Sequence, residues 1–170
     1  MKKLNVLAIC FLIVILTASL GSLFTSSAVN SPWYQTIKPS ITPPNYVFPI
    51  AWGILFFMIA LSLYFAWTNA KKRPETKFPA RRKLTSFLAK QKKIVAAVFG
   101  INLVLNVLWS ALYFGMKNPL LGFCDIVLLW ISILAMIIAL WKIDRISSYL
   151  LVPYFLWVSF ASVLNFLSIR

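Results

Sequence analysis

The chain has 170 residues, 61% of them hydrophobic and 12% charged, with a net charge of +14 and a mean hydropathy of +0.86. Soluble domains carry about 25% charged residues, so this composition excludes an ordinary water-soluble protein. The positive charge does not predict nucleic-acid binding, because ten of the seventeen basic residues lie in one segment, residues 71–93, between two apolar runs.

Five apolar runs of membrane-spanning length follow one another along the chain. A transmembrane helix needs about 20 apolar residues, and such runs cover residues 4–24, 46–68, 94–114, 120–141 and 148–169. The runs show no strand-like alternation, so helices are the structure that satisfies their backbone hydrogen bonds in lipid. The sequence therefore predicts an all-α integral membrane protein in which residues 1–170 form one domain, a bundle of five transmembrane helices.

The first run allows two interpretations. Lys2 and Lys3 precede it, and the small residues Ser26, Ser27 and Ala28 follow it, as in a cleaved signal peptide. The apolar core of a signal peptide has about 7–15 residues, and this run is longer. We therefore expect an uncleaved signal-anchor helix, with a cleaved signal peptide as the alternative.

The connection between the first two runs, residues 25–49, is long and rich in proline. It contains four prolines after Lys38, and it also carries the large side chains of Trp33, Tyr34 and Phe48. A segment that is stiffened by proline and rich in aromatic residues is expected to fold over the end of the bundle. The sequence predicts a lid at this place, with a simple rigid connector as the alternative.

The basic segment, residues 71–93, predicts the orientation in the membrane. Two further basic residues precede the first run and two lie between the last two runs, whereas Lys38, Lys117 and Arg170 are the three on the opposite side. Basic loops stay on the cytoplasmic side and attract anionic headgroups of the lipid bilayer. We expect a plasma (inner) membrane protein with a cytoplasmic N-terminus and the C-terminus outside.

Polar and aromatic residues share one face of the third run and one face of the fifth. Helical spacing aligns Asn102, Asn106, Trp109 and Tyr113 on the third, and Tyr154, Trp157, Ala161 and Asn165 on the fifth. Amides are costly in hydrocarbon, so these faces are expected to point into the bundle. They form either hydrogen bonds between helices or a ligand pocket with indole walls. Trp33, Trp67 and Trp141 lie near the ends of runs, where aromatic residues often form a belt at the interface.

The ionisable residues limit the chemistry that the chain can perform. It has no histidine and only three acidic residues, and Cys10 and Cys124 both lie within apolar runs. We therefore expect no disulfide, no metal site and no hydrolytic or metal-assisted catalysis. Asp125 is the one acid inside a run. It is either a proton relay or cation partner, or a structural residue that is hydrated or hydrogen-bonded to a neighbouring helix.

Several short motifs together carry a resemblance to a known family. They are Trp33-Tyr34, Lys38-Pro39, Pro43-Pro44, Val47-Phe48 and Trp52 around the lid, Leu105-Asn106 and Trp109-Ser110 in the third run, and Pro153-Tyr154, Trp157, Phe160-Ala161 and Leu164-Asn165 in the fifth. In this pattern the chain resembles the tryptophan-rich sensory protein family, which includes the translocator protein, or peripheral-type benzodiazepine receptor. The resemblance covers essentially the whole chain.

The resemblance implies a membrane receptor or sensor, often a homodimer, that binds tetrapyrroles such as porphyrins and other hydrophobic small molecules, with or without transport. The porphyrin is a ligand, and no cofactor is required. In relatives, the residues that match Trp52 and Asn106 contact ligand in a cavity closed by the first loop. Taken together with the polar faces, the expected ligand-binding residues are Trp33, Tyr34, Trp52, Asn102, Asn106, Trp109, Tyr154 and Trp157.

Two other functions remain open from the resemblance. One is an enzyme that degrades porphyrin in light, with Tyr34 and Trp157 as its catalytic residues, and the other is a tetrapyrrole carrier.

The chain departs from the family pattern at two positions that affect the expected ligand contacts. Asn102 replaces the longer Gln of many members, and Phe166 stands where the sterol-contact motif of animal members needs Tyr, so sterol binding is not carried over.

Overall fold

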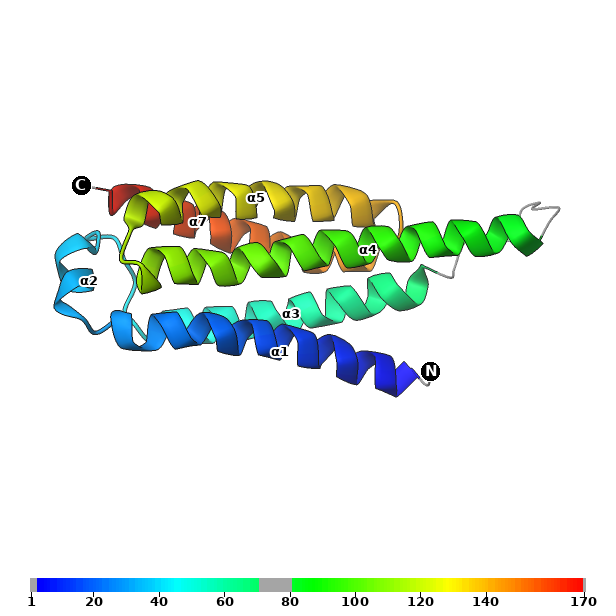
Figure 1. Cartoon of the computed structure of the whole chain (residues 1–170), viewed down its shortest axis with the longest axis horizontal. Helices are drawn as coiled ribbons and strands as arrows, with labels where there is room; N and C mark the ends of the chain where they lie inside the picture. Colours follow the sequence, from blue (N-terminus) through cyan, green and yellow to red (C-terminus); the bar gives the residue numbers. More distant parts are fainter. Residues whose placement is uncertain (1–2, 71–80, 170) are drawn as a thin grey trace.

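The computed structural model describes the backbone of residues 3–70 and 81–169, together with their side chains except those of residues 81–86. Most of the described chain is helical, with short connections between the helices. Its elements are α1 (Lys3–Ala28), α2 (Pro32–Ile37), α3 (Val47–Asn69), α4 (Arg81–Ser110), η1 (Ala111–Gly115), α5 (Pro119–Trp141), α6 (Arg145–Leu150) and α7 (Val152–Leu167). The long helices run side by side, and α2 lies across one end of the bundle (Figure 1).

The described residues contain five segments that are long and apolar enough to cross a membrane, namely Lys3–Ala28, Val47–Asn69, Phe87–Gly115, Pro119–Trp141 and Arg145–Leu167. This confirms the predicted five-helix architecture. The start of the third helix was predicted wrongly, because α4 already begins at Arg81, inside the expected basic loop. Residues 81–93 are mostly Arg, Lys, Leu, Ala and Gln, which are good helix formers. The remainder of that loop, residues 71–80, lies outside the described residues.

The predicted lid contains a helix that the proline pattern did not reveal. Helix α2 begins with Pro32 at its first position, and the Ser31 hydroxyl accepts a hydrogen bond from the backbone N–H of Tyr34. Serine before a first-turn proline is a common helix start. Beyond α2, the Lys38 ammonium donates to Oδ1 of Asn45 at 3.3 Å. This bond closes the proline-rich turn that leads into α3.

A single π turn ends the third membrane-spanning helix. Helix α4 passes into η1 at Ala111, and the N–H of Met116 bonds to the carbonyl of Ala111 at 2.8 Å. A π turn inserts one extra residue, and such turns often occur at functional sites. Here the change of register turns two neighbouring rings, Tyr113 and Phe114, into the protein at once, with their centroids 4.7 Å apart.

The fifth membrane-spanning segment, predicted as one helix, is two. Helix α6 ends at Leu150, with Leu151 as its C-cap, just before Pro153, which supplies no N–H for a continuous helix. The Asp144 carboxylate caps α6 by accepting from the N–H and the hydroxyl of Ser147 at 2.9 and 2.7 Å. It also accepts from Nδ2 of Asn69 at 3.0 Å. These bonds fix α3 to α6 at the end of the bundle opposite α2.

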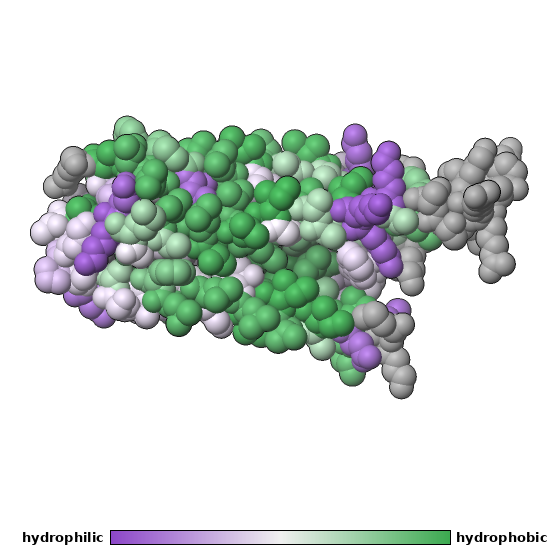
Figure 2. Space-filling model, in the orientation of Figure 1, coloured by the Kyte–Doolittle hydropathy of each residue, from purple (hydrophilic) through white to green (hydrophobic). Residues whose placement is uncertain are grey.

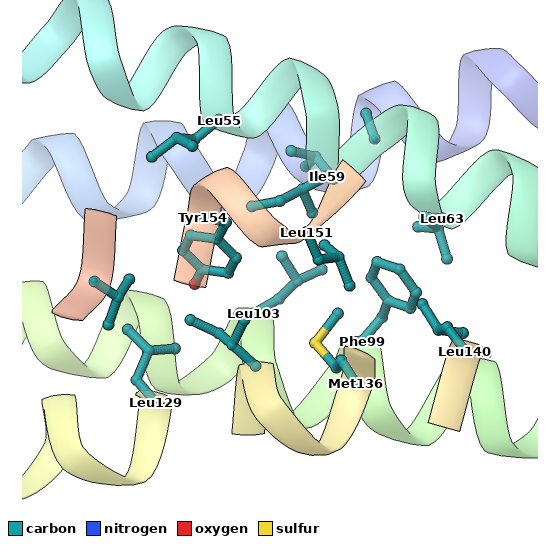
Figure 3. Packing of buried hydrophobic residues seen from close by; sticks show 14 of the residues in the cluster. Leu55, Ile59, Leu63, Phe99, Leu103, Leu129, Met136, Leu140, Leu151 and Tyr154 are labelled. Atoms are coloured by element: carbon teal, nitrogen blue, oxygen red, sulfur yellow. The ribbon is translucent and has the colours of Figure 1, made fainter. Parts of the chain in front are cut away.

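Aliphatic and aromatic side chains fill the centre of the bundle. Figure 3 shows Ile59, Leu103, Met136 and Leu151 meeting between the helices. The outer surface is also apolar, and hydrophobic residues cover the middle of the molecule while hydrophilic ones gather toward its ends (Figure 2). Many large apolar side chains are exposed; that of Leu156, for example, is 63% exposed. A surface of this kind faces lipid, where no polar coat is needed.

Candidate functional site: an aromatic cavity beneath α2

A cavity of about 420 Å³ lies between α1, α3 and α4 at the end of the bundle that α2 covers. This volume falls within the range of about 300–1,000 Å³ that is typical of small-molecule sites. One wall is aromatic and is formed by Trp52, Phe56, Trp109 and Phe114, with Tyr34 of α2 above them. The opposite wall is formed by α1.

The α1 wall consists mainly of small side chains. Ala18, Gly21, Ser22, Thr25 and Ser26 line the cavity and follow one another at helical spacing on a single face. Small residues at these positions let α1 border an open space without filling it. This wall was not predicted, although the stripe of small residues is visible in the sequence.

The aromatic wall is a continuous group of rings. Trp52 lies 5.4 Å from Phe56 and 6.3 Å from Trp109, measured between ring centroids. Trp109 in turn stacks on Tyr113 at 5.7 Å with an interplanar angle of 19°. Such distances are typical of favourable aromatic pairs. The wall therefore offers a rigid, flat and polarisable surface to a ligand.

Tyr34 holds α2 down on the bundle. Its side chain is only 6% exposed, and its ring lies 5.7 Å from that of Phe114. Trp33 packs edge-on against Tyr113, with ring centroids 6.0 Å apart. Trp33 and Tyr34 of α2 are therefore both packed on residues of η1. Burial raises the pKa of Tyr34 to about 12, with a smaller contribution from nearby Tyr113. The Tyr34 hydroxyl is therefore neutral at physiological pH.

The polar groups beside the cavity are tied to other helices. The Asn106 side chain lines the cavity and donates from Nδ2 to the Tyr154 hydroxyl at 3.1 Å. The Trp109 indole donates to Oδ1 of Asn165 at 3.0 Å, and Asn102 donates from Nδ2 to the Ser132 hydroxyl at 2.8 Å. The polar faces thus form hydrogen bonds between helices, and one of the amides also borders the cavity.

The structure brings four of the eight expected ligand-binding residues to the cavity wall: Tyr34, Trp52, Asn106 and Trp109. The other four lie around it. Trp33 packs beyond Tyr34, while Asn102 and Tyr154 are fully buried in the bundle. Trp157 contacts the cavity residue Phe48, with ring centroids 5.9 Å apart. Its indole nitrogen is buried and has no hydrogen-bond partner among the described residues.

Of the three remaining tryptophans, Trp130 lies within α5 and donates to the Ser159 hydroxyl at 2.8 Å. Trp67 and Trp141 lie at the far end of the bundle, away from the cavity. Lys92 approaches the ring of Trp67 at 5.1 Å, and Arg145 approaches that of Trp141 at 5.5 Å. These two tryptophans lie at or near the ends of α3 and α5, as the belt interpretation predicts.

Comparison with known proteins settles the family. The model of the TspO/MBR family matches residues 8–170, which is nearly the whole chain. The chain belongs to the TspO/MBR family. It is thus an integral membrane protein of a family whose named members include sensory and translocator proteins.

Relatives in this family come from bacteria, archaea and animals. The tryptophan-rich protein TspO of Chlorobaculum tepidum is 38% identical over 97% of this chain and 94% of its own length. The TspO of Archaeoglobus fulgidus is 39% identical over 86% and 83%. The human translocator protein is 26% identical over 89% of this chain and 83% of its own.

Proposed function

We propose that this TspO/MBR protein is a receptor or sensor that binds tetrapyrroles of the protoporphyrin type, and other hydrophobic molecules, in the cavity beneath α2. The observation that supports this most strongly is the aromatic wall around Trp52 and Trp109, which faces a slot bordered by the small residues of α1. A flat macrocycle suits such a slot, because its faces stack on indole rings. Binding removes a large apolar surface from water and lipid headgroups.

The polar residues at the cavity suit the edge of such a ligand. Asn106 offers a buried amide at the base of the cavity, and Asn45 lies at the lid end, bonded to the Lys38 ammonium. Lys38 thus brings a positive charge to the side where a propionate would meet water. We propose that the macrocycle enters with its carboxylates toward α2 and its apolar edge toward Phe56.

A second candidate is porphyrin degradation driven by light. It is supported by the position of Tyr34, a buried phenol in the cavity wall, and by the contact of Trp157 with Phe48. Both are oxidisable rings close to the space that a pigment would occupy. The sensor remains our leading proposal, because aromatic walls serve binding without reacting.

One experiment tests both functions. Purified protein is titrated with protoporphyrin in the dark, and the same samples are then illuminated. We expect saturable quenching of tryptophan fluorescence, and a loss of pigment absorbance in light no faster than that of free pigment in detergent. Absence of saturable quenching would overturn the proposed binding. Faster loss in the wild type that slows in both Tyr34→Phe and Trp157→Phe, with dark binding retained within a few-fold, would establish the enzyme.

We also propose that α2 lies on the outer side of the plasma membrane, as the distribution of basic residues indicates. Ser40 and Lys142 are exposed at opposite ends of the bundle. In a chain with Cys10→Ala and Cys124→Ala, we expect Ser40→Cys to react with a membrane-impermeant thiol reagent in intact cells. Lys142→Cys should react only after the cells are opened. The reverse labelling pattern would contradict this orientation.

A further inference from the structure

Asp125 lies inside the bundle on α5 without any visible partner. It is only 3% exposed, and both its carboxylate oxygens are buried without a hydrogen bond to any described residue. A carboxylate in hydrocarbon is costly unless it is paired. Of the two interpretations that the sequence left open, the direct hydrogen bond to a neighbouring helix does not occur in the described structure. The protonated, uncharged carboxyl form of Asp125 fits this environment.

The neighbours of Asp125 have too few donors for their acceptors. Tyr154 interacts electrostatically with Asp125, and its hydroxyl oxygen already accepts from Nδ2 of Asn106. Oδ1 of Asn102 is a further buried acceptor without a hydrogen bond from any described donor, although the Tyr154 hydroxyl lies close to the Asn102 side chain. The phenolic hydrogen of Tyr154 can serve only one acceptor at a time. One additional proton, carried by Asp125, supplies the donor that this cluster lacks.

Among the side chains that the structure describes, no opposite charge lies beside Asp125 to hold it in its ionised form. The helices packed against α5 are α4, α6, α7 and η1. Their described titratable groups are Lys90, Lys92 and Lys93 in the first half of α4, Arg145 and Tyr149 in α6, Tyr113 in η1 and Tyr154 in α7. Among these groups, Tyr154 is close enough to Asp125 for an electrostatic interaction. Arg145 and the lysines belong to the opposite end of the bundle from η1 (Figure 1).

The same residues connect Asp125 with the cavity. Asn106 lines the cavity, and its side-chain amide also donates a hydrogen bond to the Tyr154 hydroxyl. Figure 3 shows Tyr154 projecting from α7 with its oxygen directed toward the side of α4. Asn106 therefore links the cavity to Tyr154, the residue close enough to Asp125 for an electrostatic interaction.

We propose that Asp125 is an intramembrane proton-binding site, and that its protonation is linked to occupation of the cavity through Asn106 and Tyr154. The linkage, though not the proton site itself, rests on the proposed ligand binding. A ligand acceptor that draws the Asn106 amide toward the cavity breaks its hydrogen bond to the Tyr154 hydroxyl. That hydroxyl oxygen then needs a new donor, and a small movement of protonated Asp125 supplies one. Bound ligand thus favours protonated Asp125, so binding is accompanied by proton uptake above the pH at which the free protein loses this proton.

The proton site is tested first, without ligand, by infrared spectroscopy. A protonated carboxyl absorbs above the amide band, and the chain has only three acidic side chains, so assignment is direct. We expect this band at neutral pH in the wild type and in a Glu75→Gln, Asp144→Asn control, which retains Asp125 as its one acidic side chain. It should be absent in Asp125→Asn. A control protein that lacks the band at neutral pH would overturn the proposal, even if Asp125→Asn fails to fold.

The linkage is tested by protoporphyrin titrations over a range of pH. Because the bound state favours protonated Asp125, affinity should be highest at low pH and fall by up to about tenfold per pH unit above the point where the free protein loses this proton. The protoporphyrin propionates also titrate, so the informative quantity is the difference between wild type and Asp125→Asn. We expect Tyr154→Phe to keep the infrared band and to share the weaker pH dependence of Asp125→Asn.

The results separate this proposal from the proposed function. Equal pH dependence in wild type and Asp125→Asn, with binding intact, would overturn the linkage alone. An infrared band without any protoporphyrin binding would overturn the proposed function and the linkage, and would leave the proton site standing. Loss of the pH dependence in Asp125→Asn but not in Tyr154→Phe would contradict the route through Tyr154.

Discussion

Ser22→Phe should reduce protoporphyrin affinity by about 100-fold or more, which corresponds to roughly 2.8 kcal/mol. Ser22 lies in the α1 wall of the cavity, so a phenyl ring at this position extends toward Trp52 and Trp109 and occupies the slot itself. The affinity is measured from the change in pigment absorbance during titration. The new ring enters an open space and displaces no packed side chain, so the helices should remain folded.

The matched control is Ser27→Phe. Ser27 is an exposed residue of the same helix, outside the cavity and on the opposite face from Ser22. The substitution introduces the same phenyl ring at position 27, but this ring points away from the cavity. We expect wild-type affinity in this variant. An equal loss in both variants would point to a general effect on α1, and unchanged affinity in Ser22→Phe would rule out this cavity as the binding site.

Trp52→Ala should weaken binding by roughly 30-fold, or about 2 kcal/mol, because it removes a large ring from the centre of the aromatic wall. The rings of Phe56, Trp109 and Tyr154 all lie within 6.3 Å of Trp52. A ligand that stacks on this group loses its principal contact. Isothermal titration or pigment absorbance gives the affinity.

Trp141→Ala provides the comparison. Trp141 is 44% exposed at the far end of α5, where its neighbours are Tyr149 and Arg145. Removing it deletes an indole of the same size without touching the cavity, so affinity should stay within about twofold. Loss of affinity only in Trp52→Ala supports the site. A Trp52→Ala protein that binds as tightly as the wild type would remove Trp52 from it.

The periodicity of the polar faces predicted some features of the site and left others undecided. The alignment of Asn102, Asn106 and Trp109 on one helix face is visible in the sequence, since it depends only on the helical repeat. Which of them would border a cavity is not visible there. Asn102 bonds to Ser132 of α5, whereas Asn106 reaches both the cavity and Tyr154. Partners on other helices decide this difference.

Two local features altered the predicted arrangement. The regular spacing assumed for Tyr113 ends at the π turn of η1, which brings Phe114 inward beside it. Helix α2, hidden among prolines and aromatic residues, places Tyr34 on Phe114. The packing of Tyr34 on Phe114 joins segments that are far apart in the sequence. Local helix propensity does not predict contacts of this kind, because they depend on the tertiary structure.

The sequence by itself determined that this protein spans the membrane five times, because the length and hydropathy of each run are local properties that the bilayer selects. Only the tertiary structure decided where the cavity lies. Small residues such as Gly21 and Ser22 of α1 would equally suit a tight contact between helices. Whether such a face borders a neighbouring helix or an open space depends on how closely α3 and α4 approach it. The side chains of all three helices fix that distance together.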